Sequence, residues 1–290
     1  KRERCCGEDT KWIFMEMNAQ PLVSIITPVY NGAEYLDELI QSVLRQDYPN
    51  IEHLIIDDGS QDDGATVSVL KKYPHLRWWS RENFGQYATM NEGLDAARGN
   101  IICFVSADDI VATSAVSLVF EFLESHPNHD GVFGITSFID KNGEPLPNLL
   151  PFRHAPMFFI PYFAHVSHCS LYIKRQSLLH HQLDFDPSLK FVGDYEWMIR
   201  INKSKLKIGI FDNILSKVRL HDSQISHIFD KESSLEAKLV LKKHKVNKFY
   251  HFILWGGYLL IARIKKIITL YKNSGIKEVI SRIKKYYLGK

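Results

Sequence analysis

Short apolar runs alternate with amphipathic stretches along the first half of the chain. The apolar runs lie at residues 23–27, 54–56, 76–80, 101–105 and 131–138. Between the first two runs, apolar side chains repeat at helical spacing from residue 36 to residue 44. Runs this short are typical of strands buried on both faces of a sheet. The alternation therefore predicts an α/β domain built on a doubly wound sheet.

Two of the predicted strands end in pairs of acidic side chains. Asp57 and Asp58 follow the second run, and Asp108 and Asp109 follow the fourth. Open α/β sheets bind ligands at the carboxyl ends of their strands, so both pairs should lie along one edge. Carboxylates without nitrogen or sulfur ligands suit a hard cation such as Mg²⁺ or Mn²⁺. The alternative is that these aspartates only cap turns and helices.

Two loop patterns lead to further expectations. The helix predicted before the fourth run should end at Gly99, which would adopt a left-handed cap. Residues 149–164 combine prolines with aromatic side chains and show no regular period. Such a stretch is more typical of a pocket wall or a lid than of a sheet.

The composition is that of a globular protein. The chain has 290 residues, 45% of them hydrophobic and 24% charged, which allows one large domain with an appendage. Its cysteines, Cys5, Cys6, Cys103 and Cys169, show no metal-binding spacing, which favours reduced thiols over zinc ligands or disulfides. The first 18 residues lack the apolar core of a signal peptide, so we expect a cytoplasmic location.

The charge is concentrated at the carboxyl end. The formal net charge is +3, but residues 231–290 hold fifteen Lys and Arg against three acids. Residues 252–262 form an apolar run of eleven, too short to span a bilayer. This pattern predicts a basic amphipathic helical tail that lies on an anionic membrane surface. The alternative is a helical appendage packed on the main domain. No recognised nucleic-acid-binding module accompanies the basic residues, so nucleic acid is not an expected partner.

Six motifs, in order and spacing, resemble those of a known enzyme family. They are SIITPVYNGAEYL, IIDDGSQD, ENFGQYATMNEGLDAARGNIICFVSADD, HCSLYIKR, FVGDYEW and LHDSQIS, and they cover residues 22–227. Together they resemble the inverting family-two glycosyltransferases of GT-A type, which use nucleotide sugars. The resemblance implies a GT-A fold, that is, a Rossmann-like, doubly wound mixed sheet.

The resemblance also implies which residues bind the nucleotide sugar. Pro28 and Tyr30 would hold the base, Asp58 would hydrogen-bond it, and Asp108 would contact the ribose. Three more residues, on the loop and helix before the fourth strand, would shape the pocket. They are Gly85, Gln86 and Asn91. A plainer interpretation is that the glycine only allows a turn.

A divalent cation, Mn²⁺ or Mg²⁺, is implied in the same way. Asp109 would ligate it on the diphosphate, and His221 would approach the same site. Such a cation stabilises the charge that develops on a departing nucleoside diphosphate. Many relatives carry an acid where this chain has Ser106, so the acidic motif is shortened here.

No enzyme nucleophile is needed for an inverting transfer, but a general base must deprotonate the acceptor hydroxyl. Asp194 matches the family's base position, although Gly193 stands where relatives usually have Glu. Asp194 is also a suitable N-cap for the helix that follows it. The resemblance places His168 on the acceptor side.

These observations predict an N-terminal extension at 1–20, a GT-A catalytic domain at 21–230 and the basic tail at 231–290. The nucleotide-binding half would be 21–110 and the acceptor half 111–230. The expected activity is sugar transfer from a nucleotide sugar, UDP being the first guess, to a glycan or lipid-linked hydroxyl, on the inner face of the membrane. Two alternatives stay open. One is nucleotidyl transfer, which would require a basic residue directly after the first strand to hold a triphosphate. The other is a catalytically inactive nucleotide-sugar-binding module.

Overall fold

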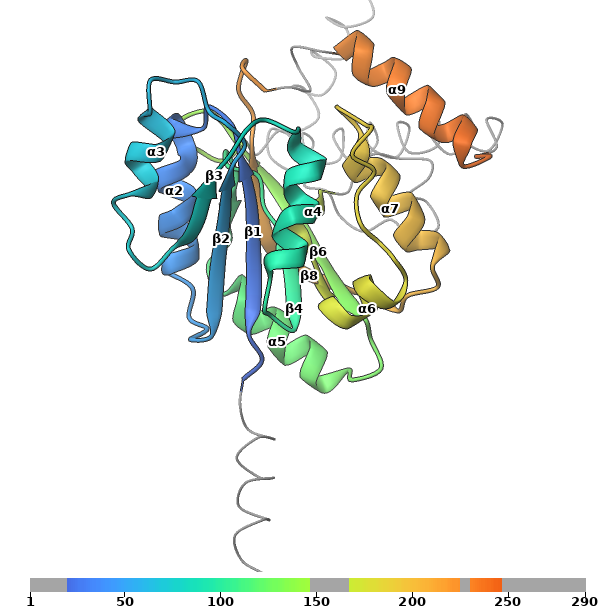
Figure 1. Cartoon of the computed structure of the whole chain (residues 1–290). Coiled ribbons are helices and arrows are strands. Elements are labelled where there is room, and N and C mark those ends of the chain that lie inside the picture. The colour runs from blue at the N-terminus through green and yellow to red at the C-terminus, as the bar shows by residue number, and fades with distance from the viewer. Residues whose placement is uncertain (1–19, 147–166, 225–229, 247–290) are drawn as a thin grey trace, which may run out of the picture.

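The computed structural model describes residues 20–146, 167–224 and 230–246 (Figure 1). Within these ranges, eight strands form one sheet in the order β3-β2-β1-β4-β7-β6-β8-β5. The strands are β1 (Val23–Val29), β2 (Ile51–Asp57), β3 (Arg77–Ser80), β4 (Ile101–Phe104), β5 (Ile110–Val111), β6 (Gly131–Ile139), β7 (Leu171–Lys174) and β8 (Ile208–Arg219). β1 to β4 are parallel, β7 is antiparallel to β4 and β6, and β5 is antiparallel to β8. The sheet is therefore mixed, as the resemblance implied.

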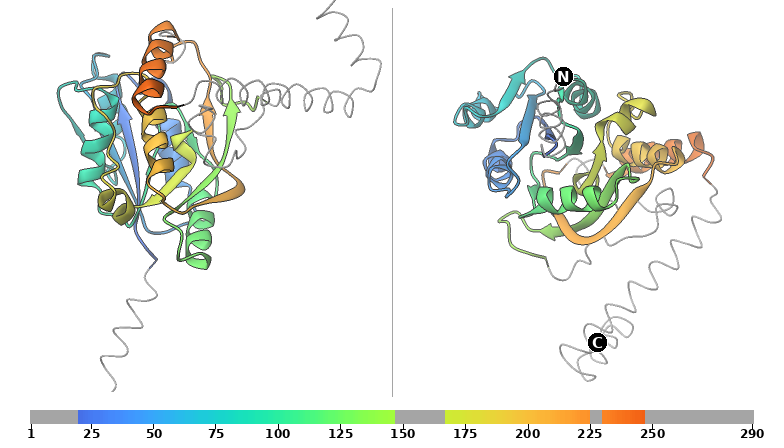
Figure 2. Two further views of the ribbon diagram at one scale, coloured as in Figure 1. Left: turned by 90° about the vertical axis from the view of Figure 1, so that its right-hand side faces the viewer. Right: turned by 90° about the horizontal axis from the view of Figure 1, so that it is seen from below.

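Helices cover both faces of this sheet (Figure 2). The α-helices of the described residues are α2 (Ala33–Leu44), α3 (Ala65–Leu70), α4 (Gln86–Ala96), α5 (Ala115–Ser125), α6 (Arg175–His180), α7 (Gly193–Lys203) and α9 (Asp230–Lys243), of which α9 packs beside α7. Neighbouring residues of β1 point into opposite cores, as the twofold period of a strand requires. Ile25 packs with the side chains of α2 and α5, and Ile26 packs with those of α4 and α7. The doubly wound α/β arrangement predicted from the apolar pattern is confirmed.

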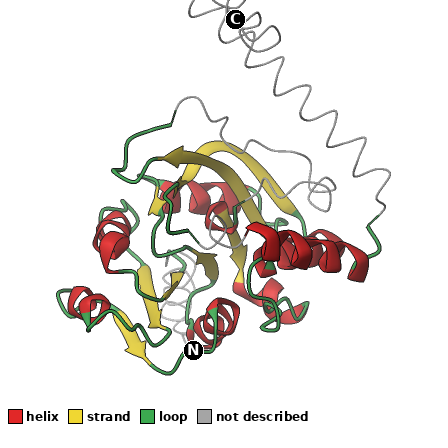
Figure 3. Cartoon of the chain, turned by 90° about the horizontal axis from the view of Figure 1, so that it is seen from above, coloured by secondary structure: helices red, strands yellow, loops and turns green. Residues whose placement is uncertain are grey.

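The sheet order brings the two acidic corners together. β1 lies between β2 and β4, so the loops after β2 and β4 flank the carboxyl end of β1. The amide of Asp58 donates to Val29 O at 2.8 Å, and the amide of Val105 donates to Ile26 O at 2.9 Å. Figure 3 looks down on this edge, where loops converge above the strands. The expectation that both acid pairs share one edge is confirmed.

The structure corrects the expectation for Gly99. Helix α4 ends at Ala96, its C-cap Ala97 is extended, and Gly99 is not among the residues with positive φ. A Cβ at Gly99 would lie 2.4 Å from Ser24 Oγ and 2.8 Å from Leu22 O. The glycine is therefore required for a close approach to β1 and not for a left-handed cap.

Other expectations have mixed outcomes. Cys103 and Cys169 are free, buried thiols, as predicted. β8 was not predicted, because its twelve residues alternate poorly between buried and exposed positions. The irregular stretch at 149–164 and most of the basic tail lie outside the described residues. The described beginning of the tail, α9, packs beside α7 (Figure 1). In the described parts of the chain no helix is both long and apolar enough to cross a membrane.

Candidate active site

Asp57 stabilises the loop that follows β2. Its carboxylate accepts hydrogen bonds from Ser60 Oγ at 2.5 Å and from Ser80 Oγ at 2.6 Å. It is 1% exposed, so both oxygens are committed inside the protein. Asp57 therefore stabilises the turn, which is the alternative role that the sequence analysis considered for these aspartates.

Asp58 holds a different segment, the loop before α4. Its carboxylate accepts from the backbone amides of Phe84 at 2.9 Å and Gly85 at 3.0 Å, and it pairs with Arg81. Gly85 has φ +91°, a conformation that favours glycine, and it is the N-cap of α4. The structure therefore brings Asp58 and Gly85 together, and Gln86 follows as the first residue of α4.

The expected base-binding residues lie at the end of β1. Pro28 is buried within the strand, whereas Tyr30, just after it, is 47% exposed. An exposed aromatic ring at a ligand-binding edge is available for stacking on a planar base. Asn91 is placed differently: its amide accepts from Phe185 N at 2.7 Å and donates to Phe185 O at 2.9 Å. Its side chain anchors the segment before α7 to α4.

The corner after β4 holds two carboxylates with different surroundings. Asp108 is partly exposed, and its Oδ2 lies 3.0 Å from Nε2 of His221. Asp109 is 4% exposed; its Oδ1 accepts from the amide of Arg219 at 3.0 Å, and its Oδ2 accepts from the Cys169 thiol at 3.0 Å. Burial raises the pKa of Asp109 well above its ordinary value, and the neighbouring Cys169 and Asp108 add to the rise. His221 was expected to approach the metal site of Asp109, and in the structure it contacts the neighbouring Asp108.

His168 connects this corner to Asp194. Its Nε2 lies 3.5 Å from Cys169 Sγ and 3.4 Å from Ser106 Oγ, and its Nδ1 lies 3.5 Å from Asp194 Oδ2. Burial alone would lower the pKa of His168, but Cys169 and Asp194 raise it well above its ordinary value. Burial alone would raise the pKa of Cys169, but His168 lowers it to about 7. Cys169 was not among the expected site residues, although it stands beside His168 in the matched motif HCSLYIKR.

Asp194 lies in the first turn of α7, and the N-cap of that helix is Val192. The interpretation of Asp194 as an N-cap is therefore wrong. Its Oδ1 accepts from Tyr195 N at 2.8 Å and from the hydroxyl of Tyr87 at 3.4 Å. Burial would raise the pKa of Asp194, but its contacts with His168 lower it below the ordinary value. The side chain keeps 35% of its surface exposed, so it is accessible from solvent.

The unusual Gly193 has a structural reason. A Cβ there would lie 2.6 Å from ring carbons of Tyr87, so only glycine leaves room for this ring. The ring is buried, with 3% of its surface exposed, and its hydroxyl reaches Asp194. The departure from the Glu-Asp pattern thus makes room for the ring whose hydroxyl reaches the expected general base.

Arg219, the last residue of β8, is a further site residue that the sequence analysis missed. It is 1% exposed, its Nε donates to Asp108 O at 2.9 Å, and its amide donates to Asp109 Oδ1. Its guanidinium also pairs with Glu38 of α2 and stacks 4.6 Å from the Tyr35 ring centroid. Its position two residues before His221, in the stretch VRLHDSQIS, is the feature of the sequence that could have indicated a role at the site.

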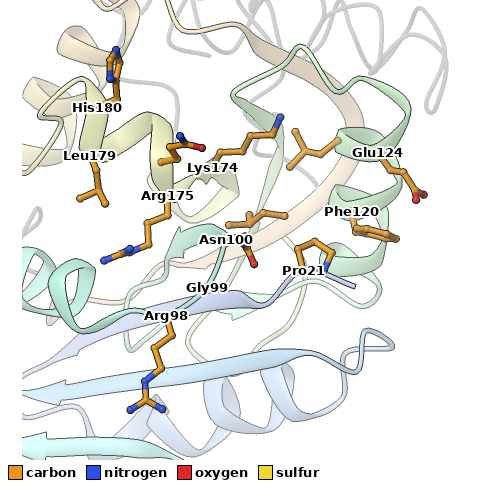
Figure 4. A pocket seen from close by; sticks show the side chains of 13 residues that line it. Pro21, Arg98, Gly99, Asn100, Phe120, Glu124, Lys174, Arg175, Leu179 and His180 are labelled. Atoms are coloured by element: carbon orange, nitrogen blue, oxygen red, sulfur yellow. The ribbon is translucent and has the colours of Figure 1, made fainter. Parts of the chain in front are cut away.

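A hollow of about 820 Å³ lies at the other edge of the sheet, where β1 and β4 begin (Figure 4). Its lining includes Pro21, Asn100, Lys174 and Arg175, and it contains none of the expected site residues. Among the residues that the structure describes, no three His, Cys, Asp or Glu side chains are grouped so that they could hold a metal ion by themselves. The candidate site is the acidic edge, at the carboxyl ends of β1, β2 and β4.

Solved structures support the class of fold. S. aureus TarS in complex with UDP-GlcNAc matches with a TM-score of 0.63 at 20% identity, covering 78% of this chain and 67% of that chain. The mannosyltransferase PcManGT from Pyrobaculum calidifontis, in complex with GDP-Man and Mn²⁺, matches with a TM-score of 0.57 at 16% identity, covering 93% and 81%. The chain has the GT-A fold of these glycosyltransferases.

Sequence comparison identifies the family. The model of glycosyl transferase family 2 matches residues 24–183. A glycosyltransferase of Rickettsia felis is 33% identical over 70% of this chain and 35% of its own length, and one of Methanocaldococcus jannaschii is 29% identical over 79% and 81%. The chain belongs to glycosyl transferase family 2. It spans about a third of the length of its Rickettsia felis relative.

Proposed function

We propose that this chain transfers a sugar from a nucleoside diphosphate sugar to a hydroxyl acceptor, with inversion at the anomeric carbon. The observation that carries the proposal is the separation of two kinds of carboxylate. Asp108 and Asp109 lie at one corner, whereas Asp194 belongs to α7. His168 lies between them, within 3.5 Å of Asp194 and of Cys169, which donates to Asp109. The corner with Asp108 and Asp109 suits the leaving diphosphate, and the carboxylate of Asp194 suits the acceptor.

Asp194 fits the role of general base. Its pKa lies below the ordinary value, so it is ionised at neutral pH and can accept the acceptor's proton as the new bond forms. His168 Nδ1 lies 3.5 Å from one of its oxygens and the Tyr87 hydroxyl lies 3.4 Å from the other, and the exposed part of the side chain is available to the acceptor. Orientation of this kind contributes to the rate because the reacting atoms need little further rearrangement.

The acidic corner fits a divalent cation in part. Asp109 would hold Mn²⁺ or Mg²⁺, with Asp108 and His221 beside it, and the remaining ligands would be oxygens of the diphosphate and water. The cation would neutralise charge on the leaving nucleoside diphosphate. Burial raises the pKa of Asp109, and a cation bound beside this carboxyl would favour its ionised form.

UDP is our first choice of nucleotide, and TarS supports it because that protein is seen in complex with UDP-GlcNAc. The complex of PcManGT with GDP-Man and Mn²⁺ makes GDP the competitor to test. Calorimetry should show that UDP binds more tightly with Mn²⁺ than in EDTA, and that Asp109→Asn removes the difference. The exposed Asp95→Asn is the matched control. Equal UDP affinity in EDTA and in Mn²⁺ would contradict metal-dependent binding.

A turnover assay tests the role of Asp194. A panel of UDP- and GDP-sugars, with hydrolysis and transfer followed separately, identifies the donor. Asp194→Asn should then lower turnover by roughly two to four powers of ten and leave donor affinity nearly unchanged. The anomeric configuration of the product, read by NMR, reports inversion. Turnover at the wild-type level in Asp194→Asn would assign the base elsewhere.

The proposed setting is synthesis of a cell-surface polysaccharide or glycolipid, with the protein peripheral on the inner face of the membrane. The supporting observation is the excess of Lys and Arg in residues 231–290. Each such residue near an anionic surface contributes about 1 kcal/mol, and salt weakens the attraction. The full chain should sediment with vesicles that contain anionic lipid and should be released by salt. Equal partitioning of the full chain and of a chain ending at Val246 would contradict this setting.

A further inference from the structure

One carboxylate of helix α9 accepts three hydrogen bonds from the segment that leads into α7. Glu236 Oε1 accepts from Lys190 N at 2.9 Å, and its Oε2 accepts from Phe191 N at 2.7 Å and Val192 N at 2.9 Å. Three consecutive backbone amides thus converge on one side chain that lies 44 to 46 residues away along the chain. Figure 1 shows α9 lying beside the start of α7.

These amides belong to the turn that begins α7. Val192 is the N-cap of the helix, and Asp194 lies two residues after it. The first amides of a helix and the turn before it have no partner within the helix. Glu236 supplies that partner from another helix, and its negative charge also suits the positive end of the α7 dipole. The position of Asp194 therefore depends on a contact that its own helix does not provide.

The other end of α9 is anchored as well. Lys243 Nζ lies 2.8 Å from Asp186 Oδ2, and His244 Nε2 lies 2.8 Å from Oε1 of Glu196, a residue of α7 with 0% exposure. The hydrogen bond from Lys243 lowers the pKa of Asp186 to about 2. Val240, between these anchors, is 1% exposed. Polar contacts thus hold α9 at Glu236 and again at Lys243 and His244, with a buried valine between them.

We propose that Glu236 is a positioning residue for the transfer reaction: it holds residues 190–192 so that the Asp194 carboxylate keeps its place beside His168 and Tyr87. This inference rests on the proposed role of Asp194 as general base. Loss of the three hydrogen bonds would let the turn before α7 move, and Asp194 would move with it. A displacement of about 1 Å at a reacting group can cost up to roughly a hundredfold in rate.

The test uses the full chain and compares Glu236→Ala with Glu232→Ala. Glu232 is an exposed acid on the same helix, so both variants change the charge of α9 equally. Glu236→Ala should lower kcat roughly tenfold to a hundredfold, while the KM for the donor and the affinity for UDP with Mn²⁺ stay within about twofold. Glu236→Gln, which keeps one carbonyl oxygen, should restore part of kcat and provides the measurement if the alanine variant does not fold.

A double-mutant cycle separates positioning from general loosening. Because the effect acts through the base, Glu236→Ala should change kcat less than about twofold when Asp194→Asn is already present. The inference is overturned if Glu236→Ala behaves like Glu232→Ala, if the alanine and glutamine variants lower donor affinity as much as kcat, or if the loss persists in the Asp194→Asn background. Wild-type turnover in Asp194→Asn alone would instead overturn the proposed function.

Discussion

Removal of the Arg219 guanidinium should destabilise the protein and disorder the acidic corner together. The substitution Arg219→Met keeps most of the aliphatic stem and removes the charged donors. In the structure these donors reach three carbonyl oxygens, those of Asp108 at 2.9 Å, Asp140 at 3.3 Å and Lys141 at 3.2 Å, and the carboxylate of Glu38. The four partners come from α2, the corner after β4 and the turn after β6.

The sizes of these contributions differ. A hydrogen bond from a charged group contributes about 1.5 to 3 kcal/mol, and the long bonds to Asp140 and Lys141 fall at or below the lower end. The Glu38 side chain is 44% exposed, so it would be hydrated after the substitution, and the ion pair itself contributes less than about 1 kcal/mol. We expect a total loss of roughly 3 to 4 kcal/mol, most of it from the lost hydrogen bonds to the carbonyl oxygens of Asp108 and Lys141. The Asp140 oxygen keeps a donor, because it also accepts from the Gly143 amide at 3.0 Å.

Urea unfolding measures this loss. With a slope of about 2 kcal/mol per M, Arg219→Met should lower the midpoint by roughly 1.5 to 2 M. Glu38→Gln is the matched control and should cost less than about 1 kcal/mol. Calorimetry of the folded variant should also show a loss of about tenfold in UDP affinity with Mn²⁺, because Asp108 O loses its bond from the guanidinium. The amide of residue 219 still donates to Asp109 Oδ1 in the variant. A cost under about 1 kcal/mol, or equal costs for the two variants, would refute the reasoning.

Three more predictions concern other buried groups. Burial lowers the pKa of His53 to about 3, so the unfolded chain takes up the proton first, and the contribution of His53 to the free energy of unfolding should fall by about 1.4 kcal/mol per pH unit below pH 6.5. Urea unfolding at pH 7 and pH 5 should therefore show a smaller loss of stability for His53→Leu than for the wild type, and equal losses would contradict this. Gly93→Ala places a Cβ 2.3 Å from Ile26 Cγ2, so it should lower the free energy of unfolding by roughly 1 to 3 kcal/mol, despite the better helix propensity of alanine. Thermal unfolding measures this loss, and a raised Tm would show that α4 can shift. Tyr87→Phe removes the hydroxyl near Asp194 and should lower kcat severalfold at constant UDP affinity; unchanged kcat would leave the ring as a packing group only.

The amino-acid sequence by itself determined the class of fold and the edge of the sheet at which the two acid pairs lie. Apolar runs of strand length and the amphipathic stretch at 36–44 are local patterns, and local patterns predict strands and helices. The acids after β2 and β4 follow their strands directly, so a parallel arrangement places them at one edge whatever the details of the loops. The six motifs then indicated the family, which the family model confirmed.

Only the tertiary structure decided which side chains meet. Asp109 and Arg219 are 110 residues apart, and Glu236 lies 44 residues from Val192, so no local period could pair them. Their contacts depend on strand order, on the register of β8 and on the docking of α9, which are set by long-range packing. The same holds for Gly193. In the sequence it is only a departure from the family pattern, and the fold shows that it leaves space for the Tyr87 ring. Close packing explains this, because a buried position is defined by all of its neighbours, and most of those neighbours are distant in the chain.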